Sequence, residues 1–525
     1  MNTKALRQKI LDLAIRGKLV PQDPNDEPAE VLLERIRKQK QQMLKEGKLK
    51  KKDIKNDTII FKGEDNLHYE KFQDGTVKCI EDEIPFEVPE GWAWCRLNDI
   101  YNFIDYRGAT PTKIINGIPL VTAKNVKSGY IDYTIDDYIS EEEFKERQQR
   151  GISKKGDILF TTEAPLGNAA LADIEKFSAG QRLITFQQYG SKNELINYVM
   201  LMFILSDFFQ QQLCVNKTGS TVAGIKAAIL KTLWIPVPPY NEQLKITNTL
   251  KSAINLIDSI SQNKEILSTS ISNTKSKILD LAIRGKLVPQ DPNDEPASVL
   301  LERIRAEKEE LIKQGKIKRD KKESVIFRGD DNSYYLRTGR VEESLEDWRF
   351  DDLPETWKIC CLGELCDYGD CINVNTEDIA EDAWILDLED IEKDTGTVLK
   401  KVTKDQRNSV STKHKFHSEQ VLYSKLRPYL NKVVLSDADG YCTSEILPLE
   451  FKNCVLPEYA RYYLMSGTFI TYANHCSYGV KMPRLGTTDG KKAIFSLPPL
   501  SEQKRIVETI DFCFMQLNKI SEALA

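Results

Sequence analysis

The motif in this chain that most resembles a catalytic one is a proline pair followed by an aromatic residue, VPPY at Val237–Tyr240. Amino-methyltransferases use a similar (D/N)PP(Y/F) motif, in which the Asp or Asn side chain accepts a hydrogen bond from the exocyclic amine that is methylated. Val237 has no polar side-chain atom that could accept this bond. A second version, LPPL at Leu497–Leu500, lacks the acceptor as well. Both copies therefore indicate a proline-defined exit from a domain.

Other fragments of catalytic motifs are also incomplete. Gly151–Asp157 reads GISKKGD, which has the glycine spacing of a phosphate-binding loop but lacks the Lys-Ser/Thr pair that contacts phosphate and metal. Asp53 and Lys55 form a D-x-K fragment of the kind found in nuclease sites, although such fragments are common by chance. None of the four histidines lies in an evident nucleophile–base arrangement. The sequence therefore predicts no catalytic residue and a chain that performs no chemistry by itself.

Metal binding has little support in the cysteine pattern. Four of the eleven cysteines cluster, at Cys360, Cys361, Cys366 and Cys371, but they form no CxxC pair. We expect reduced thiols and no metal, with a zinc site as the alternative reading.

Composition limits location and partners. The chain has 525 residues, of which 41% are hydrophobic and 29% are charged, and this length predicts three or four domains. No apolar run reaches the length of a membrane span, and the charged N-terminus has no signal core. We therefore expect a cytoplasmic protein with no membrane contact. The net charge of −5 argues against a basic surface overall but allows local DNA-binding patches.

A long internal repeat organises the chain. Lys9–Arg37 and Lys277–Arg305 differ at one of 29 positions, Glu30 against Ser298, so the unit is duplicated. Each copy predicts two helices joined by a Pro/Asp/Asn-rich connector, with Asp26 as the cap of the second helix in the first copy. A basic run follows the second helix in both copies, at 45–55 and 313–322, and either a solvated helix end or phosphate contact would explain it.

Each repeat leads into a region that differs between the halves. The first region, roughly 92–238, begins at Trp92, and the second, roughly 357–498, begins at Trp357. Both contain short β-rich runs, glycine turns and helical stretches. Both also end in a proline pair followed by Glu-Gln, PPYNEQ and PPLSEQ. The regions are therefore two mixed domains of ordinary size inserted between copies of one helical frame.

Heptad patterns follow both exits and also mark the N-terminus. The coiled-coil positions expected from them are Ile246, Leu250, Ile257 and Ile260 in the central helix, Leu6, Ile10 and Leu13 at the N-terminus, and Ile506, Ile510, Leu517, Ile520 and Leu524 at the C-terminus, with Ala253 completing the central register. The C-terminal helix aligns with the first part of the central helix and the N-terminal helix with its second part. The sequence thus predicts a pseudo-twofold arrangement in which one long helix is continuous and its antiparallel partner is split between the chain ends.

The predicted fold class is α+β, with two mixed α/β domains separated by this antiparallel helical pair. The expected segments are an N-terminal helical repeat (1–80), a first domain (81–240), a central helical region with the second repeat (241–345), a second domain (346–500) and a C-terminal coiled-coil helix (501–525).

With this plan, the chain resembles the specificity subunit of a type I restriction–modification enzyme. Gly156–Ile184 (GDILFTTEAPLGNAALADIEKFSAGQRLI) and Gly219–Lys226 (GSTVAGIK) look like the first target-recognition domain of that family. Trp384–Leu399, Val421–Val433 (VLYSKLRPYLNKV) and Ser477–Gly486 (SYGVKMPRLG) look like the second. The resemblance covers essentially the whole chain.

The resemblance implies that each recognition domain reads one half of a split DNA site, and that the helices set the length of the unread spacer. Two methyltransferase subunits would dock on the chain, bind S-adenosylmethionine and methylate adenine N6, and restriction (translocase–nuclease) subunits using ATP and Mg would join for cleavage. The chain itself would bind double-stranded DNA and no cofactor. Because the two domains differ, the site would not be palindromic.

Candidate DNA-contacting residues lie in polar loops flanked by glycine. In the first domain they are Arg107, Thr110, Lys113, Lys124, Asn125, Lys217, Ser220, Thr221 and Lys226. In the second domain they are Lys425, Arg427, Tyr429, Lys432, Tyr478, Lys481 and Arg484. Lys226 and Lys481, which occupy similar places before the exit prolines, are the first choices for phosphate contact. Two other readings stay open, a DNA-bridging adaptor outside restriction and a coiled-coil protein scaffold.

Overall fold

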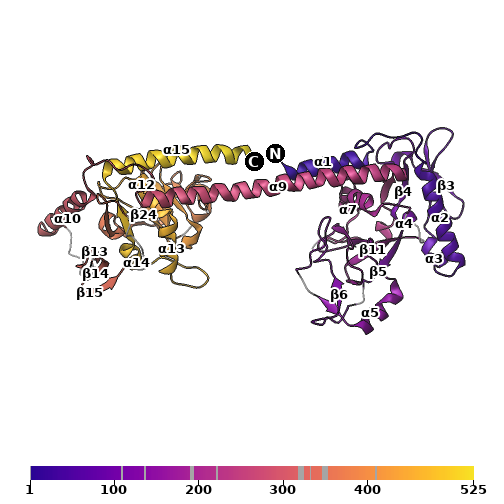
Figure 1. Cartoon of the computed structure of the whole chain (residues 1–525), viewed down its shortest axis with the longest axis horizontal. Helices are drawn as coiled ribbons and strands as arrows, with labels where there is room; N and C mark the ends of the chain where they lie inside the picture. Colours follow the sequence, from indigo (N-terminus) through magenta and orange to yellow (C-terminus); the bar gives the residue numbers. More distant parts are fainter. Residues whose placement is uncertain are drawn as a thin grey trace. The chain divides into compact units, whose positions relative to one another are not determined.

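A computed structural model describes residues 2–107, 110–134, 137–189, 194–219, 223–316, 324–331, 333–345, 353–407 and 411–524 (Figure 1). The chain divides into two compact units, Met1–Asn263 and Lys264–Ala525. The boundary lies within the 44-residue helix α9 (Tyr240–Ile283). Each unit thus joins helical elements to one of the divergent regions, while the five expected segments stay a prediction.

Unit 1 begins with helices from the first repeat and continues into the first divergent region. Its helices are α1 (Thr3–Ile15), α2 (Ala29–Lys45), α3 (Lys51–Ile54), α4 (Leu97–Ile100), α5 (Glu141–Arg147), α6 (Asn197–Ile204), α7 (Asp207–Asn216), α8 (Ala227–Leu230) and the first part of α9. Its strands are β1 (Ile59–Lys62), β2 (His68–Lys71), β3 (Val77–Cys79), β4 (Ala93–Arg96), β5 (Tyr101–Asp105), β6 (Ile118–Val121), β7 (Tyr138–Ile139), β8 (Ile158–Thr161), β9 (Ala169–Leu171), β10 (Ser178–Ala179), β11 (Leu183–Gln188) and β12 (Trp234–Val237).

Unit 2 likewise begins with helices from the second repeat and continues into the second divergent region. Its helices are the second part of α9, α10 (Ala297–Lys313), α11 (Leu362–Leu365), α12 (Pro457–Leu464), α13 (Gly467–His475), α14 (Thr487–Lys492) and α15 (Leu500–Leu524). Its strands are β13 (Ser324–Arg328), β14 (Tyr334–Thr338), β15 (Val341–Ser344), β16 (Lys358–Cys361), β17 (Ile372–Val374), β18 (Trp384–Leu386), β19 (Val402–Thr403), β20 (Lys413–Phe416), β21 (Val421–Ser424), β22 (Val433–Leu435), β23 (Gly440–Thr443), β24 (Ile446–Leu449) and β25 (Ile494–Leu497).

Some of the sheets are common to the two units, and others differ between them. In both units a two-stranded antiparallel ladder joins the first and last strands of the divergent region, β4 with β12 and β16 with β25. A three-stranded core is also shared, β9-β8-β11 in unit 1 and β22-β21-β24 in unit 2. Unit 1 adds β5 to this core and has a separate three-stranded sheet, β10-β6-β7, whereas the separate sheet of unit 2 has five strands, β17-β20-β23-β18-β19. The two domains therefore share the ladder and the three-stranded core and differ in the strands around them.

The Glu-Gln pair that follows each proline exit connects the divergent region to a long helix through hydrogen bonds. Trp92 donates its indole N–H to the buried carboxylate of Glu242 at 2.9 Å, and Gln22 donates to the other carboxylate oxygen at 3.1 Å. The neighbouring Gln243 donates to the Pro238 carbonyl at 2.9 Å and accepts from the backbone N–H of Ile196 at 2.8 Å. These bonds explain the Glu-Gln pair after the first exit.

The same fastening occurs in unit 2. Trp357 donates to Glu502 at 2.9 Å, and Gln290 donates to the same carboxylate at 2.5 Å. Gln503 bonds the Pro498 carbonyl and the backbone N–H of Leu456. The two divergent domains are therefore connected to their helices by equivalent hydrogen bonds.

The repeat connector also serves this attachment. Gly17 has φ +67°, and a Cβ there would collide with the ring of Pro89. Asp26 is not the cap of the second helix, because α2 begins after Pro28, which makes no side-chain cap bond. The Asp26 carboxylate instead accepts a hydrogen bond from Asn241 at 2.8 Å. The expected cap was wrong because a tertiary partner on α9 takes this carboxylate.

Within each unit, α9 has an antiparallel neighbour. In unit 1, α1 lies along α9, with Arg7 paired to Asp258 (Figure 1). In unit 2, α15 lies along α9, and Lys275 donates to Asn518 at 2.6 Å (Figure 1). The split partner helix predicted from the sequence is thus present as two separate helices, each in its own unit.

Burial along these helices only partly follows the heptad expectation. Ile246, Leu250, Ile257, Ile506 and Ile510 are buried, Ile260, Leu6, Ile10, Leu13, Leu517 and Leu524 are partly buried, and Ile520 is 45% exposed. The α9 register uses Ile254 where Ala253 was expected. In α1 the buried residues are Leu11, Ala14 and Ile15, because α1 packs on α6 and α7 as well as along α9. The apolar stripe therefore faces a domain core in addition to a helix.

Among the described residues, no single helix combines the length and apolar composition of a membrane span. The bent pair α6–α7, with 57° between its helices, meets the test only when the two are joined. α6 is largely buried in the core of unit 1, which accounts for its composition.

Removing the buried carboxylate is expected to destabilise the unit that contains it. Glu242→Ala leaves the Trp92 indole without its acceptor and should lower the free energy of unfolding by about 1–3 kcal/mol. Glu242→Gln keeps an acceptor and should cost less. Urea denaturation measures both, with Glu502→Ala as the equivalent change in unit 2 and Glu265→Ala, exposed on α9, as the control. Equal losses for Gln and Ala would contradict the role of this hydrogen bond.

Candidate nucleic-acid interface

In the divergent region of each unit, two loops that are far apart in the sequence pair through their backbones. In unit 1 the loop after β8 meets the loop between α7 and α8, where Ile225 N–H donates to the Thr162 carbonyl at 3.0 Å. Thr218 and Gly224 close the second loop through two backbone bonds of 2.8 and 3.0 Å. The strands and helices on both sides are buried in the core, so the pairing presents a fixed edge of loop backbone.

Unit 2 builds the same frame. Leu485 N–H donates to the Lys425 carbonyl at 3.0 Å, and Arg427 N–H donates to the Pro483 carbonyl at 2.7 Å. Tyr478 and Arg484 close the second loop in the way that Thr218 and Gly224 do in unit 1. The domains thus share a loop frame despite their different sequences.

This register corrects one expectation about matching lysines. Lys226 lies at the N-cap of α8, and the residue at the N-cap of α14 is Gly486. Lys481 instead lies inside the loop that Tyr478 and Arg484 close. Lys226 and Lys481 are therefore not equivalent, because the shared proline exits fix the order of elements but not the position of a charge within a loop.

A cavity of about 370 Å³ opens beside the paired loops of unit 1. Two predicted residues, Arg107 and Lys226, line it together. Residues that the sequence did not single out complete the wall, among them Glu163, Gln181 and Arg182. All three lie in Gly156–Ile184, the segment that resembles the first target-recognition domain of the family, and this resemblance could have pointed to them. Only the fold shows that they lie beside the second loop.

The remaining candidates of the first domain fall outside this cavity. Thr110, Lys124 and Lys217 are exposed, and exposed Lys113 pairs with Asp137 at 2.6 Å. Asn125 is 2% exposed, and its side chain bonds Thr122 and the Asp132 carbonyl, so it supports its own loop and not the interface. Ser220 and Thr221 lie outside the described residues.

In unit 2 most candidates gather at the shared frame. Lys425, Arg427 and Arg484 lie on its paired backbone, and Tyr478 and Lys481 belong to the closed loop. Tyr429 is exposed next to this frame in sequence, whereas Lys432 donates to the Leu388 carbonyl at 2.6 Å. Val480 and Met482 add apolar surface at the loop, with Val480 fully exposed.

Known proteins share this organisation. A family model described as the type I restriction modification DNA specificity domain matches residues 89–268 and 354–523, which together exceed half of the chain. The chain belongs to this specificity family. The specificity subunit of the type I restriction enzyme EcoAI from Escherichia coli is 28% identical over 98% of this chain and 90% of its own length.

Two further likenesses agree. The EcoEI specificity subunit from Escherichia coli is 30% identical over 69% of this chain and 61% of its own length. A chain from a structural study of "complex assembly and conformational transition of the type I R-M system" shares the fold with a TM-score of 0.52 at 16% identity, covering 84% of this chain and 94% of that one. The fold of the specificity family is therefore that of two recognition domains with helical flanks.

Two of the candidate arginines each pair with a carboxylate. Burial favours the protonated form of Asp105, but hydrogen bonds from Arg107 outweigh it and lower the pKa of this carboxyl. Hydrogen bonds from Arg484 to Glu445 raise the pKa of Arg484. Both guanidinium groups are thus charged and held by a carboxylate.

The cysteine cluster has no metal-ligand geometry among the described residues, which contain no group of three or more His, Cys, Asp or Glu side chains able to hold an ion. Cys360, Cys361 and Cys366 are buried in apolar cores. Burial raises the pKa of the Cys360 and Cys366 thiols, so both are held in the thiol form.

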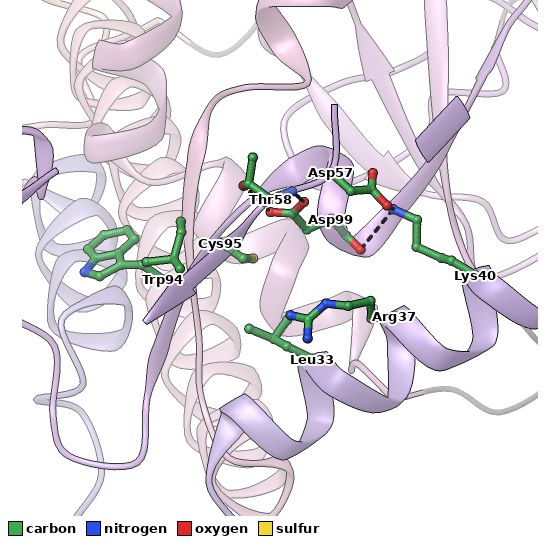
Figure 2. A pocket seen from close by; sticks show the side chains of 9 residues that line it. Leu33, Arg37, Lys40, Asp57, Thr58, Trp94, Cys95 and Asp99 are labelled. Carbon is green, nitrogen blue, oxygen red and sulfur yellow. Dashed lines mark hydrogen bonds and ion pairs between the residues drawn. The ribbon is translucent and has the colours of Figure 1, made fainter. Parts of the chain in front are cut away.

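A buried ionic cluster lies apart from the loops, between α2 and the start of the first domain (Figure 2). Lys40 on α2 pairs with Asp57 at 2.5 Å and donates to the Asn98 carbonyl at 3.0 Å. Asp99 accepts from the backbone N–H groups of Thr58 and Arg96, each at 2.9 Å. The cavity here is only about 20 Å³, about the space of one water molecule, so the cluster is structural.

Burial shifts the titration of this cluster. Loss of solvation lowers the pKa of Lys40 and raises the pKa of Asp57. It raises the pKa of Asp99 to about 6. Each shift disfavours the charged form.

The Asp99 shift predicts a pH-dependent stability. The folded chain holds this proton more tightly than the unfolded chain, whose Asp groups titrate near pH ~3.9. The stabilisation is complete below about pH 4 and is lost as the pH rises through 6. Asp99→Asn resembles the protonated acid without titrating. Its free energy of unfolding relative to the natural chain should therefore rise by about 1–3 kcal/mol between pH 4 and pH 7. Urea denaturation at both pH values measures this difference, and a constant difference would contradict the shift.

Proposed function

We propose that each recognition domain reads one half of a bipartite, asymmetric DNA site. The observation that carries the proposal is the loop frame, which has the same backbone pairing in both units but different side chains. Sequence is read through side chains at base edges, while a common frame gives both domains the same approach to DNA. Different side chains on one frame select different half-sites. The family match favours this reading over a bridging adaptor or a scaffold.

The partner subunits follow from the repeated helices. Val31 on α2 and Val299 on α10 are each 40% exposed. The ion pair of Arg35 with Glu27 at 2.7 Å has an equivalent in unit 2, Arg303 with Glu295 at 2.8 Å. Two equivalent surfaces suit two copies of one partner. We assign them to two methyltransferase subunits that bind S-adenosylmethionine and methylate adenine.

Restriction subunits using ATP and Mg would join this assembly for cleavage, and the complex would work in the cytoplasm. The chain itself would bind no cofactor and catalyse no step.

Co-expression with methyltransferase genes found next to the gene for this chain tests the function. We expect a complex of one copy of this chain with two methyltransferase subunits. Binding selection from random DNA duplexes should recover two different short half-sites at a fixed separation. Failure to associate with any co-expressed methyltransferase, or recovery of no sequence, would overturn the proposal.

The continuous helix α9 is proposed to set the spacer between half-sites. Inserting four residues near Leu267 adds about 6 Å of helix, close to two base pairs at about 3.4 Å each. A whole heptad adds about 10 Å. Selection should then recover the same half-sites with a longer spacer. An insertion of equal length in the turn at Asp74–Gly75 is the control. Altered half-sites with unchanged spacing would contradict the ruler.

A further inference from the structure

The ion pairs at the loop frame are arranged differently in the two units. In unit 1, Arg182 lies just before β11 and pairs with Glu163 at 3.1 Å. In unit 2 the equivalent position before β24 carries Glu445, whose carbonyl accepts from Lys425 as that of Arg182 accepts from Thr162. Glu445 pairs with Arg484 at 2.7 Å. The paired arginine therefore lies on the loop before β11 in unit 1 and on the loop before α14 in unit 2.

Stability alone does not account for the pair in unit 1. The side chains of Arg182 and Glu163 are 56% and 44% exposed, and pairs so open to water contribute little to folding, about 0–1 kcal/mol. The loops are already joined by backbone hydrogen bonds in both units. Both units keep the same backbone pairing of the loops, but the arginine and the glutamate of the ion pair occupy different positions. The ion pair is therefore not required for the loop frame itself.

The carboxylates orient the arginines. Glu445 accepts from Nε of Arg484 at 3.0 and 3.1 Å and from Nη2 at 2.7 Å, while Nη1 donates to the Met482 carbonyl at 3.1 Å. In the unit 1 cavity, Asp105 accepts from Nε of Arg107 at 2.9 Å and from Nη2 at 2.6 Å. Nη1 of Arg107 also donates to the Ile225 carbonyl at 3.5 Å. A guanidinium held in this way has a fixed plane, and one N–H group on each terminal nitrogen is left to donate.

We propose that Arg107 and Arg182 in unit 1 and Arg484 in unit 2 are specificity-determining residues that recognise guanine in their half-sites. Each donates N–H groups to guanine O6 and N7 in the major groove. Asp105, Glu163 and Glu445 are positioning residues that act through these arginines. This inference rests on the proposed function and names the bases that the domains select.

The choice of guanine over phosphate follows from charge. A phosphate bound to any of these arginines would bring its negative charge close to a carboxylate, whereas the guanine edge offers two acceptors without net charge. Lys217, Lys226 and Lys481 have no ion pair within the described part of the chain, and they suit phosphate contact better. The two kinds of cation thus divide positioning on the backbone from reading of the bases.

The half-site preference of single variants tests the proposal. The full chain is purified with its co-expressed methyltransferase subunits, and binding is measured on duplexes in which each base pair of the selected site is changed in turn. The natural chain should lose about 10- to 100-fold in affinity when a recognised G·C pair is replaced. Arg182→Ala should abolish that discrimination at one position of one half-site, and Arg484→Ala at one position of the other.

The second half-site is an internal control for folding, because each variant should retain its preferences there. Lys226→Ala should weaken binding to all sequences by a similar factor and reduce the salt dependence. Lys155→Ala, which removes an exposed ion pair with Glu175 elsewhere in the same domain, should change neither. Glu445→Gln should weaken discrimination at the base pair that Arg484 reads and at no other.

Two outcomes would overturn the inference. One is a uniform loss of affinity in the arginine variants with discrimination intact, which would make these residues phosphate contacts. The other is unchanged discrimination at every base pair. Both differ from failure of the proposed function itself, in which the natural complex would select no sequence.

Discussion

A buried hydrogen bond between an indole and a carboxylate fixes the rest of each unit. Trp92 begins the first recognition domain, and Glu242 begins the helix that leaves it. Their contact therefore closes the domain and ties it to α9 in one step. The buried carboxylate must keep its donors, since an unpaired charge there would cost several kcal/mol, and Gln22 from the repeat connector supplies the second donor. The near-identity of the repeats preserves this connector in both units.

The sequence was most informative where a feature occurs twice. The duplicated helices, the tryptophans at the start of each domain and the Glu-Gln after each exit all reappear as equivalent contacts. It was least informative about long-range pairing. The bond between Ile225 and Thr162 joins loops that are far apart along the chain, and short strands give no periodic signal from which to predict it. The partners of Arg182 and Asp26 were hidden for the same reason.

Local sequence patterns gave wrong predictions where one helix packs against two different neighbours. The heptad reading of α1 expected Leu6, Ile10 and Leu13 to face a partner helix, but the most buried residues face the recognition domain. Lys40 lies on the buried face of α2, where an apolar residue would be expected, because Asp57 and the Asn98 carbonyl satisfy its charge. Such a position is recognisable only when its partners are known.

The ladder between β4 and β12 places the first and last residues of the recognition domain opposite each other, with Ala93 paired to Val237. The second domain is mounted on a ladder of the same kind, with Lys358 paired to Leu497. Each domain is thus connected to the rest of its unit through the same kind of two-stranded ladder. Because the ladder and the Trp–Glu hydrogen bond both lie at the ends of the domain, the side chains between them can differ while the contacts with the helices stay the same. The two units of this chain illustrate the consequence, because their domains differ in sequence while the repeated helices keep equivalent contacts.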